Sequence, residues 1–118
     1  MAKSNTLYRH EFNYKFGMLS VYAGVMGIRF IVFTYTRTAA EQNKRFKEGL
    51  SYCDGYKNIS MHQRDRARDL VIIDCDGKPK WPHVREYDVL AKFWKDLGGE
   101  WGGDWEHKKF DDCYHYQY

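Results

Sequence analysis

The stretch "SMHQRDRARDLVIIDCDG", residues 60 to 77, joins a charged segment to a continuous apolar run. β-Branched residues such as those at positions 71 to 73 are typical of a β-strand. The pair Asp76-Gly77 favours a tight turn, after which the chain can return over a few residues to Trp81. We therefore expect a strand that begins near residue 67, a turn and a short returning segment.

Apolar residues on both sides of this strand recur at helical spacing. One such set predicts a helix over residues 10 to 26 that ends at Gly27, and it consists of Phe12, Phe16, Leu19, Tyr22 and Met26. Another predicts a helix over residues 84 to 97 that ends at Gly98 and Gly99, and it consists of Val89, Leu90, Phe93, Trp94 and Leu97. Thr38 is suited to cap a further helix over residues 39 to 50, with Glu41 completing a capping box.

The remaining segments complete the expected fold. Residues 28 to 36 and the final residues, "CYHYQY", read as strands, whereas residues 51 to 61 and "EWGGDW", residues 100 to 105, read as loops. Helices and strands do not alternate regularly. The pattern predicts an α+β fold with a small antiparallel sheet and flanking helices.

Composition limits the classes of function. A chain of 118 residues fits one domain, residues 1 to 118. The formal net charge of +3 is too small for a dedicated nucleic-acid-binding arm, so we expect no nucleic-acid partner. The most apolar stretch, "GVMGIRFIVF", is interrupted by Arg29 and is too short to span a bilayer, so we expect no membrane segment. We also expect a monomer.

The cysteines and the first residues suggest a compartment. Cys53, Cys75 and Cys113 are odd in number and form no CxxC pair, which favours free thiols over a disulfide framework. "MAKSNTLYRH" has no apolar segment of the kind found in signal peptides. We expect synthesis in a cytoplasm without a signal peptide.

Three side chains are suited to bind a metal ion. His62 precedes the strand that carries Asp69, and His115 belongs to the last strand. Imidazole nitrogens and a carboxylate are common ligands of catalytic zinc, which takes three protein ligands and leaves a position for water. The alternative is a surface histidine in a charged loop and a second histidine packed among tyrosines.

Two further residues fit a hydrolytic reaction. Asp112 lies three residues before His115 and is suited to act as general base toward a water molecule, although Asp111 competes for the role. Arg37 follows the strand over residues 28 to 36 and is suited to stabilise an oxyanion. The alternatives are an exposed turn carboxylate and a surface charge.

Three blocks of the sequence resemble the zinc peptidases of the D-Ala-D-Ala carboxypeptidase type, a family that includes vancomycin-resistance dipeptidases and phage L-alanyl-D-glutamate endolysins. "SMHQRDRARD" resembles the motif S-x-H-x-x-G-x-A-x-D at Ser60, His62, Ala67 and Asp69. "TRTAAEQ" resembles R-[S/T]-x-x-E-Q at Arg37, Thr38, Glu41 and Gln42. The last block resembles the endolysin pattern W-G-G-D-W followed by D-x-x-H and an aromatic residue, at residues 101 to 105 and at Asp112, His115 and Tyr116.

The resemblance implies the α+β fold of Hedgehog and D,D-peptidase domains. It implies that His62, Asp69 and His115 bind Zn²⁺, that Asp112 and Arg37 are catalytic, and that Ser60 and Trp105 contact the substrate. The implied reaction is hydrolysis of a peptidoglycan stem peptide, at L-Ala-D-Glu in preference to D-Ala-D-Ala. The implied role is that of a phage endolysin that acts on the cell wall after release.

The chain departs from the family pattern at three positions. Asp65 replaces the usual glycine, Thr36 stands where an aromatic residue usually precedes the arginine, and Gln117 stands where many members have glutamate. Two other functions stay open: a non-catalytic, zinc-containing module of the same fold that binds wall peptides, and a small basic nucleic-acid-binding protein.

Overall fold

The structure is a computed structural model that describes residues 2–34, 36–106 and 111–118. Its helices are α1 (Asn5–Val25), α2 (Ala39–Lys47) and α3 (Arg85–Asp96), with a 3₁₀ turn, η1, over Gly102–Asp104. The strands β1 (Arg29–Thr34), β2 (Ala67–Ile73), β3 (Glu100–Trp101) and β4 (His115–Gln117) form one antiparallel sheet in the order β1-β2-β4-β3. The predicted α+β fold with an antiparallel sheet and flanking helices is confirmed.

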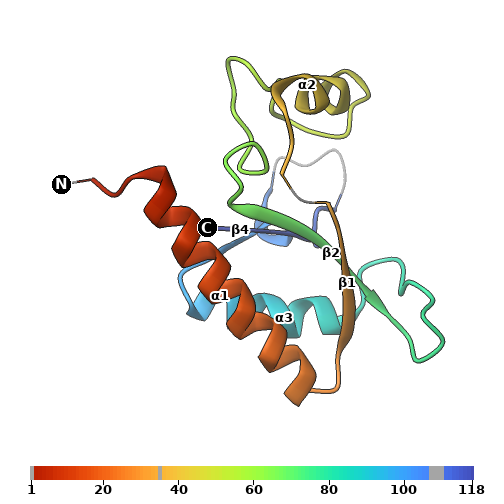
Figure 1. The fold of residues 1–118 in the computed structure, drawn as a ribbon. Helices are drawn as coiled ribbons and strands as arrows, with labels where there is room; N and C mark the ends of the chain where they lie inside the picture. The colour runs from red at the N-terminus through yellow and green to blue at the C-terminus, as the bar shows by residue number, and fades with distance from the viewer. Residues whose placement is uncertain (1, 35, 107–110) are drawn as a thin grey trace.

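The hydrophobic core lies between the sheet and the pair of helices α1 and α3, whereas α2 lies on the other side of β2 and β4 (Figure 1). Leu70 and Ile72 of β2 and Tyr116 of β4 face this core, where they meet Phe12 of α1 and Trp94 of α3. Residues alternate between the two faces of a strand, so the neighbouring residues Asp69 and His115 face away from α1 and α3.

The helices agree with the sequence in kind but not at every boundary. α1 begins at Asn5 rather than near residue 10, because the Ser4 hydroxyl accepts a hydrogen bond from the backbone N–H of Leu7 at 3.2 Å. Met26, predicted to lie on the buried face, is exposed. α2 has the predicted capping box but ends at Lys47, and the chain then turns through Gly49 at a φ of 77°.

The strands are shorter than the sequence suggests. β1 ends at Thr34 rather than residue 36, and β4 covers only residues 115 to 117. The returning segment after Asp76-Gly77 forms only an isolated bridge between Ile73 and Pro79. The segment predicted as a glycine-rich loop instead contains β3 and η1.

A β-bulge in β1 places Thr34 beside Asp69 of β2. Val32 pairs with Leu70 and Thr34 pairs with Asp69, so Phe33 is an extra residue without a partner in the register. The extra residue changes the alternation of side chains along β1. Thr34 therefore lies beside Asp69, to which its hydroxyl donates a hydrogen bond.

Among the helices that the structure describes, none has the length and hydropathy that a membrane span requires.

Candidate metal centre and active site

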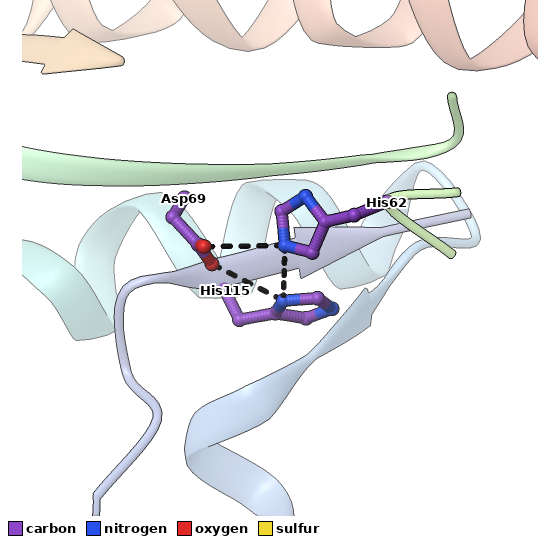
Figure 2. A group of neighbouring side chains, drawn as sticks. All are labelled: His62, Asp69 and His115. Atoms are coloured by element: carbon purple, nitrogen blue, oxygen red, sulfur yellow. Dashed lines mark hydrogen bonds and ion pairs between the residues drawn. The ribbon is translucent and has the colours of Figure 1, made fainter. Parts of the chain in front are cut away.

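His62, Asp69 and His115 come together with their side chains pointing toward one another, as Figure 2 shows. His62 Nε2 lies 3.1 Å from Asp69 Oδ2 and 3.2 Å from His115 Nδ1. His115 Nδ1 lies 3.2 Å from Asp69 Oδ1. The side chains of all three are at least nine-tenths buried. The structure thus brings together the three side chains that the sequence predicts as ligands.

The turn that carries His62 is held by its own backbone and by Asp65. The His62 carbonyl accepts hydrogen bonds from the N–H groups of Arg37 and Asp65, at 3.1 and 3.3 Å. Asp65 has a φ of 55°, in the left-handed region where glycine is usual and aspartate is tolerated. Its carboxylate accepts a hydrogen bond from the Thr36 hydroxyl at 2.7 Å. Two departures from the family pattern therefore contact each other, and the turn keeps a glycine-like backbone.

Electrostatics favour a charged carboxylate beside a neutral His62. Burial by itself would raise the pKa of Asp69, but hydrogen bonds to His115 and His62 outweigh it and hold that pKa well below its usual value. Burial lowers the pKa of His62, against the opposing effect of Asp69. His62 is therefore suited to donate a nitrogen lone pair at neutral pH.

Gln117 orients the His115 ring. Its side-chain oxygen lies 2.7 Å from His115 Nε2, and its amide nitrogen donates to Glu100 at 3.0 Å. Because this oxygen can only accept, the Nε2 atom carries a proton, and Nδ1, which bonds to Asp69 here, is the nitrogen that would bind a metal after giving up its own proton. An amide thus fills the place of the usual glutamate and fixes the ring tautomer that a metal ligand needs.

The donor set fits zinc. Two imidazole nitrogens and one carboxylate oxygen lie within 4.8 Å of one another, with their side chains held by Gln117 and Thr34. This is the number and kind of protein ligands that catalytic zinc sites use.

Arg37 lies beside the cluster. Its guanidinium donates to Asp69 Oδ2 at 3.1 Å and to the Gln42 side-chain oxygen at 2.9 Å. Burial lowers the pKa of Arg37, partly offset by Asp69, but an arginine keeps its charge at neutral pH. A fixed positive charge therefore lies within hydrogen-bonding distance of Asp69, one of the three residues predicted to bind the metal.

Asp112 and Asp111 lie in different surroundings. Asp112 is partly buried in the cleft beside the cluster, and burial raises the pKa of its carboxyl group. Asp111 is exposed and instead bonds to His83 at 2.7 Å. Of these two aspartates, Asp112 is therefore the one placed to exchange a proton in the cleft, and its raised pKa suits that task.

A cleft of about 340 Å³ opens over the cluster. Its wall includes the predicted substrate contacts Ser60 and Trp105. The Ser60 hydroxyl accepts from the backbone N–H of His62 at 3.2 Å, and the Trp105 ring centre lies 5.0 Å from that of His115. Both side chains are close enough to the cluster to contact a bound peptide.

The two glycines of "WGGDW" allow a close approach of the chain. A Cβ atom on Gly102 would contact the Asp112 backbone and lie 3.1 Å from the Cβ of His115. A Cβ on Gly103 would overlap the Trp101 ring, whose Nε1 donates to the Cys113 carbonyl at 2.8 Å. This packing fixes the segment that carries Asp112 and His115.

A second cluster, His83, Asp111 and Cys113, also has metal-binding geometry. Both ring nitrogens of His83 are engaged, one by Asp111 and the other by Asp88 at 2.9 Å. Burial raises the pKa of the Cys113 thiol to about 12, which disfavours the thiolate that metals bind. All three cysteines are free thiols, as predicted. His107, for which the sequence suggests no role, lies outside the described residues.

Two residues of the site have no role predicted from the sequence. Gln42 is fully buried and bonds Arg37, Ser51 and Cys53. A glutamine inside a capped helix at a motif position is the signal that points to it. Thr34 bonds Asp69, but its position depends on the β-bulge, for which the sequence gives no signal.

Comparisons with known proteins identify a related family and related solved structures. A family model described as D-alanyl-D-alanine carboxypeptidase matches residues 54–118. The crystal structure of the Serratia marcescens L-Ala-D-Glu endopeptidase ChiX is similar over 76% of this chain and 66% of its own, with 27% identity and a TM-score of 0.57. This chain therefore spans slightly less than two thirds of ChiX.

A second solved structure shares the fold. The vancomycin-resistance D,D-pentapeptidase VanY, in a mutant form complexed with Zn(II), matches 91% of this chain and 70% of its own, with 17% identity and a TM-score of 0.64. The comparison with curated protein sequences gave no match.

Proposed function

This chain belongs to the D-alanyl-D-alanine carboxypeptidase family, and on that basis we propose that it is a zinc-dependent peptidase that hydrolyses peptidoglycan stem peptides. The observation that carries the proposal is the convergence of His62, Asp69 and His115 in one cleft with Asp112 and Arg37. Three ligands, a base with a raised pKa and a fixed cation are the groups that metal-assisted peptide hydrolysis uses.

Each residue has a distinct role in the proposed reaction. His62, Asp69 and His115 would hold Zn²⁺, which when bound supplies a Lewis acid for the water and for the scissile carbonyl. Asp112 accepts a proton from the attacking water and passes it to the leaving amine. Arg37 stabilises the negative charge that develops on the carbonyl oxygen. Ser60 and Trp105 hold the peptide in the cleft.

We favour the L-Ala-D-Glu bond over D-Ala-D-Ala. Residues 101 to 105 resemble the endolysin branch, and ChiX, an L-Ala-D-Glu endopeptidase, is similar at 27% identity. Gly102 and Gly103 of this block pack against Asp112, His115 and Trp101, which explains why this chain needs glycine at both positions. The proposed biological role is that of an endolysin that reaches the wall after release from the cell.

Digestion of purified sacculi tests the function. The protein should release new amino termini, D-Glu if the bond is L-Ala-D-Glu and D-Ala if it is D-Ala-D-Ala. Asp112→Asn keeps the shape of the side chain but removes the base, and general acid–base catalysis contributes roughly 10²- to 10⁴-fold. Asp111→Asn is the matched control, because asparagine still offers His83 an acceptor.

Two outcomes would contradict the proposal. Full activity of Asp112→Asn with loss in Asp111→Asn would assign the base to the neighbour. If the zinc-loaded protein bound stem peptides but released no termini, the chain would be a non-catalytic wall-binding module.

A further inference from the structure

Arg45 lies in the wall of the cleft and has no role in the proposed reaction. It belongs to α2 and lines the same cleft as His62 and Asp112. Its Nε atom is buried and is without a hydrogen-bond partner in the described part of the chain. No ion pair of its guanidinium is found among the described residues either.

An arginine in this position calls for an anionic partner. A buried N–H group that loses its hydrogen bond to water destabilises the protein, more so when the group is charged, and a guanidinium stays protonated at neutral pH. The acidic residue one turn earlier in α2 is Glu41, but its carboxylate accepts from the Thr38 backbone at 3.0 Å in the capping box. The helix therefore does not neutralise Arg45.

The surroundings of Arg45 place its charge where a substrate would lie. Arg45 is near enough to interact electrostatically with both Arg37 and Asp112. Two arginines thus add positive charge to one cleft, and Arg37 is already bonded to Asp69 and Gln42. The Arg45 side chain, in contrast, has no hydrogen bond or ion pair among the described residues, so its charge in the cleft wall is left for a ligand.

We propose that Arg45 binds a free carboxylate of the peptide substrate and makes the cleft selective for acidic peptides. This inference rests on the proposed function, because it assumes that a peptide occupies the cleft. A guanidinium matches a carboxylate with two parallel hydrogen bonds, which gives both strength and orientation. A stem peptide offers two sources of this group, the α-carboxylate of D-Glu and the carboxylate at the chain end.

Binding of amidated peptides distinguishes the two sources. The zinc-loaded Asp112→Asn protein, which should bind without cutting, is titrated calorimetrically with four synthetic stem peptides. One has both carboxylates free, one is amidated at D-Glu, one at the chain end, and one at both. Each peptide is titrated into the Asp112→Asn parent and into three further proteins that add Arg45→Gln, Arg45→Lys or Lys44→Gln to it. Lys44→Gln is the control, because it removes an exposed charge from the same helix.

Arg45→Gln should weaken binding of the peptide with both carboxylates free roughly 10- to 100-fold. The peptide amidated at the recognised carboxylate should bind equally weakly to both proteins, and Arg45→Lys should restore part of the affinity. Lys44→Gln should bind as its parent does. An equal loss for all four peptides, or no difference between Arg45→Gln and Lys44→Gln, would overturn the inference.

Parallel cleavage assays separate this inference from the proposed function. If Arg45-dependent selectivity is seen but the wild type cuts no peptide, the carboxylate site stands and the peptidase proposal fails. If the wild type and Arg45→Gln cut all four peptides equally well, the peptidase proposal stands and the Arg45 inference fails.

Discussion

Replacement of Gln42 by methionine should damage both stability and catalysis. Gln42 is fully buried on α2, where it accepts from Arg37 at 2.9 Å and donates to Ser51 and Cys53 at 2.7 and 2.8 Å. Methionine fills a similar volume but makes none of these bonds. Losing a bond to a charged group and two neutral bonds costs about 3 kcal/mol in total, or a fall in Tm on the order of 10 °C.

The effect on catalysis follows from Arg37, which would keep its bond to Asp69 but lose its second anchor. We expect kcat for stem-peptide cleavage to fall by more than KM rises, because Arg37 acts on the charge that develops during the reaction. Asn43→Ala is the control. It removes one bond from the same helix to the same loop, to the Asp54 carbonyl at 2.9 Å, but it touches nothing in the active site.

Asn43→Ala should cost about 1 kcal/mol and leave kcat unchanged. Thermal melts and steady-state kinetics of the zinc-loaded proteins measure both quantities. A Gln42→Met protein as stable and as active as the wild type would refute the reasoning, as would an equal loss of kcat in Asn43→Ala.

Three other predictions concern the backbone, pH and metal. Gly102→Ala should lower both Tm and zinc affinity, because the new Cβ would push against Asp112 and His115. Gly17→Ala, in open space on α1, should instead stabilise the protein by about 0.5–1 kcal/mol. A Gly102→Ala protein with the Tm and zinc affinity of the wild type would contradict the packing. Burial lowers the pKa of His83, but Asp111 and Asp88 outweigh it and raise the pKa above its usual 6.5. The stabilisation by charged His83 is therefore complete below about pH 6.5 and is lost as pH rises through the raised value. The free energy of unfolding, measured with urea across this range, should depend on pH, and His83→Gln should reduce that dependence. An equal pH dependence in the variant and the wild type would exclude the role of His83. Removal of metal by a chelator should abolish cleavage, and zinc should restore it; undiminished cleavage by the metal-free protein would contradict a metallopeptidase.

The parts of the fold that the sequence predicts well are those fixed by local chemistry. The capping box of Thr38 and Glu41 and the stop at Gly27 depend on a few neighbouring residues, and both occur as predicted. Helix and strand lengths are less predictable because packing and side-chain caps far from the apolar pattern decide them. Ser4, for example, begins α1 before its first apolar core residue, Phe12.

The candidate site shows the same division. His62, Asp69 and His115 are recognisable because the sequence keeps every ligand position of the family motifs, although Asp65 replaces the usual glycine between two of them. The contacts that support them come from residues distant in the chain, such as Thr34, which reaches Asp69 only because of the β-bulge. The partners of Thr36 and Asp65 are equally hidden in the sequence, although together they explain how the turn tolerates both departures.

Metal analysis of the purified, zinc-reconstituted protein tests the central claim most directly. The three converging side chains predict one zinc per chain, most of it lost in His62→Ala and retained in Cys113→Ala. Cys113→Ala removes a donor from the only other cluster with metal-binding geometry in the described part of the chain. A stoichiometry well below one in the wild type, or zinc that stays in His62→Ala and leaves in Cys113→Ala, would contradict the account.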